Sequence, residues 1–290
     1  MSPAGLRLLF FSDTHLGFAP RSRTGEDTSD EYFSNFHRAL EPAFRREVDL
    51  VIHGGDVFYR SRVRPGLVFR AFEPLKKIAD SGIPVFVIPG NHERSAIPFP
   101  LLAAHPGVHI FDRSQTFSMS FRGVTVAVSG FPNDRNRIAD LFPLHLSRTG
   151  WRSHTADIRL LVMHQTVEGA RVGPVDFTFR RAPDVIPGRA IPPGFAAVLS
   201  GHIHRHQLLT DDCRHRPIAS PVFFPGSTTR TSCAERFEAK GFLTMMIDPV
   251  AGSGGRVSEW TFHELSPPTS VREDRIGQRY GHDDCMLLSR

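Results

Sequence analysis

Five short apolar runs, each followed within a few residues by side chains that bind metal ions, constrain the fold of this chain more than any other feature. The runs cover 8–11, 50–52, 85–88, 160–163 and 197–199. Continuous apolar runs of this length are typical of buried strands in α/β proteins. In such folds, ligands bind in the crevice outside the carboxyl ends of the strands. We therefore expect the side chains that follow these runs to meet at one edge of a sheet.

The side chains that follow the runs are suited to a pair of divalent cations. They are two aspartates, one asparagine and four histidines: Asp13, His15, Asp56, Asn91, His164, His202 and His204. Two cations about 3.5–4 Å apart can clamp the attacking and the leaving oxygen of a phosphoryl transfer. Asp56 is the candidate bridge between the ions. One histidine at a strand end is usually structural, but five such motifs in order favour a metal site.

Two further residues extend this site toward catalysis. His92 directly follows Asn91 and is placed to face the substrate rather than the ions. There it can stabilise the pentacoordinate phosphorus or protonate the leaving oxygen, and Glu93 can orient it.

Length and composition set wider bounds. At 290 residues and 40% hydrophobic, the chain can bury one large core. No apolar stretch approaches the roughly 18–20 residues that cross a membrane, and three irregularly spaced cysteines fit reduced thiols, so we expect a cytoplasmic protein without a membrane partner. The net charge of +5 is compatible with a polyanionic partner such as nucleic acid but does not require one.

The pattern along the chain predicts an α/β fold with parallel pairing early and antiparallel pairing late. The predicted elements are helices near 30–46 and 65–80, a hairpin of 115–121 with 124–129, and strands over 221–224, 242–247 and 257–262. Pro42 and Pro74 fall inside the helical patterns and predict a kink or an early end. We expect loops without regular structure over 21–30 and 166–194, and a loose polar tail after 265.

The order of these motifs resembles the calcineurin-like metallophosphoesterases over about residues 6–265. The resemblance implies a sandwich of two mixed β-sheets flanked by α-helices, with a dinuclear metal centre. It implies that one ion is held by Asp13, His15, Asp56 and His204, and the other by Asp56, Asn91, His164 and His202. It also implies that His92 acts on the scissile phosphate.

Within that superfamily, the residues of these motifs are most similar to those of the SbcD-type nucleases of DNA double-strand-break repair, the meiotic-recombination-eleven family. The supporting stretches are 12–17, 53–58, 164–165 and 225–227. This resemblance implies a manganese-dependent exo- and endonuclease that partners an ABC-type ATPase of the SbcC kind. Iron or zinc would suit the same ligands. The oligomeric state stays open, with a homodimer as one option.

Three departures from that family matter. Tyr59 stands where its members often have a histidine, which puts in doubt any activity that relies on a second imidazole there. Glu93 replaces the commoner aspartate and keeps the carboxylate. Only 25 residues follow Leu265, so we expect a catalytic domain over 1–265 and a polar tail over 266–290, without a capping domain.

The leading functional hypothesis is a DNA phosphodiesterase in which a hydroxide held by both ions attacks phosphorus in line. Candidate substrate contacts are Tyr59, Arg60, Arg180 and Arg181, with Arg62, Arg64, Arg171 and Arg189 as further phosphate contacts. One alternative is a nucleotide or small-molecule phosphodiesterase or phosphatase on the same scaffold. A protein phosphatase fits less well, because Asp56 is followed by Val-Phe-Tyr-Arg rather than by Val-Asp-Arg-Gly. A non-catalytic scaffold is a second alternative, although no ligand is missing.

Overall fold

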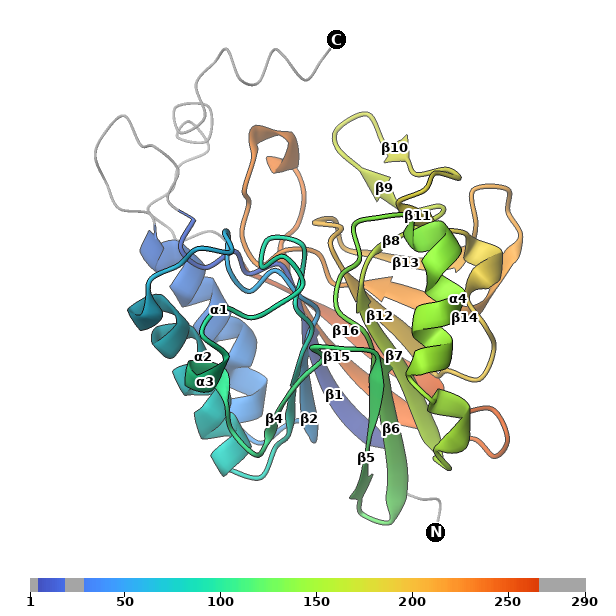
Figure 1. Cartoon of the computed structure of the whole chain (residues 1–290), viewed down its shortest axis with the longest axis horizontal. Coiled ribbons are helices and arrows are strands. Elements are labelled where there is room, and N and C mark those ends of the chain that lie inside the picture. Colours follow the sequence, from blue (N-terminus) through green and yellow to red (C-terminus); the bar gives the residue numbers. More distant parts are fainter. Residues whose placement is uncertain (1–4, 19–28, 266–290) are drawn as a thin grey trace.

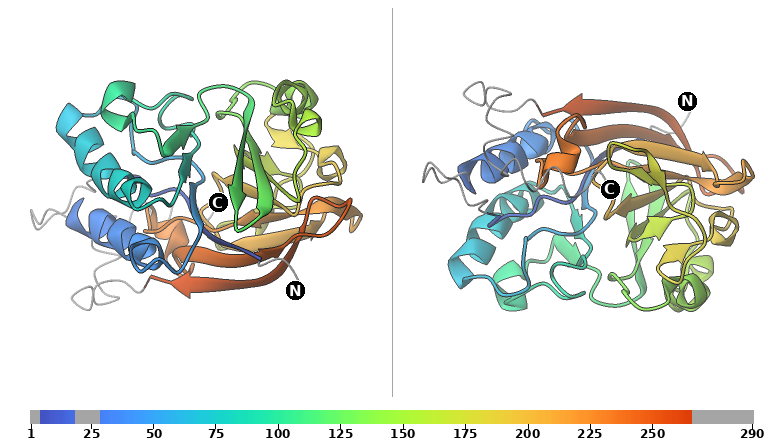
Figure 2. Two further views of the ribbon diagram at one scale, coloured as in Figure 1. Left: turned by 90° about the horizontal axis from the view of Figure 1, so that it is seen from below. Right: turned by 90° about the horizontal axis from the view of Figure 1, so that it is seen from above.

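Two six-stranded sheets pack face to face and carry helices on both outer sides (Figures 1 and 2). The computed structural model describes residues 5–18 and 29–265. The expected polar tail over 266–290, and the expected loop over 21–30 except for its last two residues, lie outside the described residues.

The first sheet has the strand order β16-β15-β1-β2-β3-β4. Its parallel strands are β1 (Leu6–Phe11), β2 (Leu50–His53), β3 (Val85–Val87) and β4 (Val108–Ile110). β15 (Gly241–Asp248) runs antiparallel to β1, and β16 (Arg256–Glu264) runs antiparallel to β15. The sheet is therefore mixed, with its parallel strands early in the chain.

The second sheet has the strand order β13-β14-β12-β7-β6-β5. Its four central strands are parallel: β6 (Val124–Gly130), β7 (Ile158–His164), β12 (Ala197–Gly201) and β14 (Pro217–Phe224). The edge strands β5 (Gln115–Phe121) and β13 (Gln207–Asp211) run antiparallel to their neighbours. The predicted α/β fold with two mixed sheets is confirmed.

The buried runs owe their unbroken apolar character to cores on both faces of each sheet. In β1, Leu8 and Phe10 join the core between the sheets, whereas Leu9 and Phe11 join the core beneath the helices. The helices on that side are α1 (Ser29–Phe44), α2 (Pro65–Asp80) and α3 (Pro100–Ala103). α4 (Ile138–Arg148) covers the second sheet. Parallel strands buried in this way direct their polar residues to the strand ends.

The structure differs from the predictions mainly in short or local elements. Both helices continue through their prolines, and Pro65 begins α2, where a missing N–H costs no hydrogen bond. The segment 166–194, expected to be irregular, contains four two-residue strands and a 3-10 turn: β8 (Thr166–Val167), β9 (Arg171–Val172), β10 (Phe177–Thr178), β11 (Val185–Ile186) and η2 (Gly188–Ala190). Strands of two residues are too short to leave a periodic pattern in the sequence. The short 3-10 turns η1 (Trp151–Ser153) and η3 (Cys233–Glu235) were likewise not predicted.

Across the described ranges 5–18 and 29–265, the structure contains no helix that is both long enough and apolar enough to span a membrane.

Candidate metal centre

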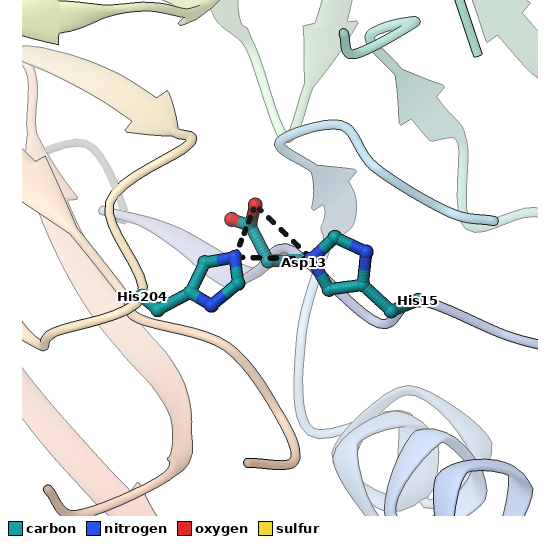
Figure 3. Close-up of side chains that lie close together, drawn as sticks. All are labelled: Asp13, His15 and His204. Carbon is teal, nitrogen blue, oxygen red and sulfur yellow. Dashed lines mark hydrogen bonds and ion pairs between the residues drawn. The ribbon is translucent and has the colours of Figure 1, made fainter. Parts of the chain in front are cut away.

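The carboxyl ends of β1 and β12 bring one group of candidate ligands together (Figure 3). The Nε2 atoms of His15 and His204 lie 3.0 Å apart. Asp13 Oδ1 lies 3.6 Å from the His204 Nε2 and 4.0 Å from the His15 Nε2. Two imidazole nitrogens and one carboxylate oxygen therefore converge on the same point.

A second group lies beside the first, where β3, β7 and β12 end. Asn91 Oδ1 lies 3.0 Å from His164 Nε2 and 2.9 Å from His202 Nδ1. Asp56 Oδ2 lies 3.4 Å from His164 Nε2 and 4.0 Å from His15 Nε2. Asp56 thus stands between the two groups, where a bridging carboxylate would be required. The structure brings together all seven residues that the sequence singled out.

The backbone at these residues adopts unusual dihedral angles. The φ angle is positive at four of the seven residues, with values of 53° at Asp13, 44° at His15, 52° at Asp56 and 83° at His202. Such conformations cost about 1–3 kcal/mol each and cluster at functional sites. Hydrogen bonds between adjoining strand ends hold them: the Asp13 and His15 N–H groups donate to the carbonyls of Gly55 and Asp56 at 2.9 and 3.0 Å.

Glycines allow the strand ends to approach this closely. A Cβ atom on Gly90 would collide with the Asp56 carboxylate, and one on Gly55 would collide with the His164 ring. Gly55 also has a φ of +107°, which side chains rarely tolerate. The glycines before Asp56 and Asn91 are thus required by the site itself.

Hydrogen bonds select which nitrogen faces the centre in two of the four candidate ligand histidines. His164 Nδ1 donates to the Gly54 carbonyl at 2.8 Å, and His204 Nδ1 donates to Glu235 Oε1 at 2.9 Å. Both rings consequently present Nε2 to the carboxylates. An outer partner of this kind fixes the tautomer and the orientation of a metal-binding histidine. His15 Nδ1 is buried and has no hydrogen-bond partner within 5–18 and 29–265.

The electrostatics of the centre are dominated by buried carboxylates. Burial raises the pKa of Asp13, whereas at Asp56 burial is outweighed by His164, which lowers the pKa well below its usual value. Burial opposes charge on His164 too, yet Asp56 and Asp13 raise its pKa to about 9. Burial lowers the pKa of His202 to about 3. Negative charge buried at this depth requires cationic partners, which divalent ions would supply.

His92 lies at the open side of the centre. Its Nδ1 donates to the Tyr59 carbonyl at 2.6 Å, its N–H donates to Asp56 Oδ1 at 2.9 Å, and its Nε2 lies 3.8 Å from Asp56 Oδ2. The side chain is 32% exposed, so Nε2 can reach a substrate.

Glu93 does not have the role expected for it. Its carboxylate accepts hydrogen bonds from the N–H groups of Phe58 at 2.6 Å and Gly90 at 2.8 Å. Burial, reinforced by Asp56, raises the pKa of Glu93 to about 8. The Tyr59 carbonyl therefore orients His92, and Glu93 ties together the loops that carry Asp56 and Asn91.

The candidate substrate residues are dispersed. The Tyr59 ring lies 5.4 Å from the His92 ring and so borders the centre, and the exposed Arg60 has its guanidinium 5.6 Å from the Tyr59 ring. Arg180 and Arg181 are exposed and line a surface pocket of about 630 Å³ beside the β9–β10 hairpin. The residues that line this pocket include none of the seven clustered residues.

Sequence reasoning missed two buried charged residues behind His204. Glu235 accepts the His204 Nδ1–H, and Lys240 Nζ lies 2.8 Å from Glu235 Oε2. Neither residue follows a strand-end motif, and Glu235 is 31 residues from the histidine that it contacts. No local signal in the sequence could have linked them.

Comparison with known proteins places this site in a family. A sequence model described as calcineurin-like phosphoesterase matches residues 6–206. The DNA double-strand break repair protein Mre11 of Thermoplasma acidophilum is 26% identical over 97% of this chain and 71% of its own length. Mre11 of Saccharolobus solfataricus is also 26% identical, over 71% of this chain and 51% of its own length.

The fold comparison agrees. The crystal structure of a dimetal phosphatase from Danio rerio matches 91% of this chain and 100% of its own, with a TM-score of 0.51 at 12% identity. That likeness shows the fold alone. The sequence match, which covers more than half of the chain, shows that the protein belongs to the calcineurin-like phosphoesterase family of hydrolases.

Proposed function

We propose that this protein is a two-metal phosphodiesterase that cleaves DNA. The observation that carries the proposal is the gathering of Asp13, His15, Asp56, Asn91, His164, His202 and His204 in a chain similar to Mre11 over 97% of its length. The named relatives are DNA double-strand break repair proteins, and this supports DNA as the substrate.

The residues present fit a pair of divalent cations. We assign one ion to Asp13, His15 and His204, the other to Asn91, His164 and His202, and Asp56 to both. Carboxylate, amide and imidazole donors suit manganese, which we propose, and also iron or zinc. When bound, such ions neutralise charge on phosphate oxygens and lower the pKa of water.

The side chains of this protein would divide the remaining work. Asp56 would connect the two groups of ligands, because its carboxylate faces His15 in one group and His164 in the other. His92 would hold a proton at Nε2 and transfer it to the leaving oxygen, since its Nδ1 is committed to the Tyr59 carbonyl. The Tyr59 ring packs beside His92 and limits how that imidazole can tilt.

The proposed DNA contacts lie around this centre. Tyr59 borders it directly, Arg60 lies next to the Tyr59 ring, and Arg180 and Arg181 would contact phosphates farther along the strand. An ABC-type ATPase of the SbcC kind stays a proposed partner. A homodimer, a cytoplasmic location and a domain boundary near residue 265 stay predictions.

The test compares three substrates on the manganese-loaded protein: a chromogenic phosphate bis-ester, the corresponding mono-ester and linear DNA. We expect turnover of the bis-ester and of DNA, little turnover of the mono-ester, and a DNA affinity that falls steeply with salt. A preference for the mono-ester, or a DNA affinity independent of salt, would favour a small-molecule phosphatase instead.

A further inference from the structure

The segment 231–240, called here the 231–240 loop, projects on the same side of the molecule as the β9–β10 hairpin (Figure 1). Glu235 in this loop contacts His204 of the candidate metal centre. Arg205, next to His204 in the chain, joins the loop to the hairpin: its Nε donates to Glu238 Oε1 at 3.0 Å and its Nη2 donates to the Gly173 carbonyl at 2.7 Å. The loop is therefore anchored to the strand end that carries a proposed metal ligand.

Glu235 lies near the middle of this loop, and both of its carboxylate oxygens have hydrogen-bond or ion-pair partners. Its Oε1 accepts from His204 Nδ1 and from Thr231 Oγ1, both at 2.9 Å, while its Oε2 faces the Lys240 ammonium at 2.8 Å. The side chain is 11% exposed. Hydrogen bonds to two further donors of the loop, the Thr231 N–H and the Ser232 hydroxyl, complete its shell. The carboxylate has no freedom to turn away from His204.

Lys240 holds the same histidine from a second direction. Its side chain is 1% exposed, which is rare for lysine. Besides Glu235, the Nζ atom donates to the His204 carbonyl at 2.9 Å and to Glu238 Oε2 at 3.4 Å. One ammonium group thus fixes both the backbone of His204 and the carboxylate that orients its ring.

We propose that Glu235 and Lys240 are positioning residues for the metal centre. They act through His204: Glu235 keeps the proton on Nδ1 and leaves the Nε2 lone pair for the ion, and Lys240 keeps Glu235 and the His204 backbone in place. A carboxylate in this position also raises the basicity of the imidazole toward a metal. The inference rests on the proposed metal centre and adds two residues that do not touch an ion.

The experiment measures manganese binding by titration calorimetry and counts bound ions, without any turnover assay. Glu235→Ala should weaken the binding of one of the two ions by about 10–100-fold, the range typical of outer partners of metal ligands. Glu235→Asp should weaken it as well, because the shortened carboxylate retreats by about one bond length, ~1.5 Å, from Nδ1 while still neutralising Lys240. Lys240→Met should weaken the same ion.

The matched control is Asp212→Asn. Asp212 is a buried carboxylate paired with Arg216 at 2.6 Å in the turn after β13, and its described contacts include no candidate ligand. The Asp212→Asn variant should bind both ions as tightly as the wild type does. A loss of affinity equal to that of Glu235→Ala would mean that general destabilisation explains both.

A spectroscopic readout separates positioning from support of the fold. In the zinc-loaded wild type, NMR should show slowly exchanging Nδ1–H protons on His164 and on His204, and the proton of His204 is identified by its loss in His204→Gln. That proton should exchange rapidly with water in Glu235→Ala. If Glu235→Ala does not fold, Glu235→Asp decides.

The outcomes separate this inference from the proposed function. Binding of both ions within twofold of the wild type in the Glu235 variants would overturn the role of Glu235, and the same result in Lys240→Met would overturn that of Lys240. A wild type that binds no pair of ions would instead overturn the metal centre itself.

Discussion

His15 and His204, 189 residues apart in the chain, place their Nε2 atoms 3.0 Å from each other. Because the Nδ1–H of His204 is committed to Glu235, a neutral His204 presents its lone pair at Nε2, toward both His15 and the Asp13 carboxylate. Three electron-pair donors directed at one point are stabilised by a cation. The pairing also joins the two sheets, since one histidine follows β1 and the other follows β12.

Asn91→Ala should remove one ion and leave the other. The Asn91 side-chain oxygen contacts both His164 and His202, so its loss opens one ligand group only. We expect the affinity for that ion to fall further than it does when a residue behind a ligand is lost, for which the typical effect is about 10–100-fold. Counting bound manganese by plasma emission checks this, and two tightly bound ions in the variant would exclude Asn91 as a ligand.

His92→Ala should retain both ions yet lose about 10²–10⁴-fold in bis-ester turnover, because general acid catalysis supplies a factor of this size. The control is His105→Ala. His105 Nε2 lies 3.0 Å from Oδ1 of Asp80, the last residue of α2. The turnover of His105→Ala should equal that of the wild type. Unchanged turnover in His92→Ala would show that another group protonates the leaving oxygen.

Metal binding should release protons at neutral pH. Burial lowers the pKa of His164, but Asp56 and Asp13 outweigh it and raise the value to about 9 in the metal-free protein. The imidazole is therefore protonated at pH 7 and must lose its proton to bind an ion, so affinity should rise with pH up to about 9. Calorimetry in buffers of different protonation enthalpy measures this release. Binding at pH 7 without proton release would contradict the assignment of His164.

Gly90→Ala should damage the site, whereas Gly66→Ala should not. A Cβ atom at Gly90 would collide with the Asp56 carboxylate, while one at Gly66 in α2 meets nothing within 4 Å. We expect Gly90→Ala to lose about 1–3 kcal/mol of stability and to weaken ion binding. Gly66→Ala should gain about 0.4–1 kcal/mol. Urea unfolding of the metal-free proteins measures both changes in stability. Equal stabilities of the two variants would mean that the loop before Asn91 relaxes freely.

The sequence predicted the gathering of the seven residues because burial and chemistry coincide at the strand ends. Each run is apolar on both faces, so its first polar residues must lie where the strand leaves the core. Asp13 after β1 and His164 at the end of β7 are examples. The local pattern was enough to place them at strand ends, but the expectation of a single sheet was wrong: β1, β2 and β3 belong to one sheet, and β7 and β12 belong to the other.

Other features depend on contacts that no local pattern records. Glu235 reaches His204 only because the 231–240 loop returns to the segment that follows β12, and Glu93 accepts hydrogen bonds from backbone N–H groups rather than contacting His92. The strands within 166–194 have two residues each, below the length at which alternation is visible. Contacts between residues far apart in the sequence determine these features.

The central claim is that one edge of the sandwich holds two neighbouring cations. Anomalous diffraction from manganese-loaded crystals tests it most directly. We predict two peaks about 3.5–4 Å apart, one beside Asp13, His15 and His204, the other beside Asn91, His164 and His202, with Asp56 between them. A single peak, or ions bound away from these seven side chains, would contradict the account.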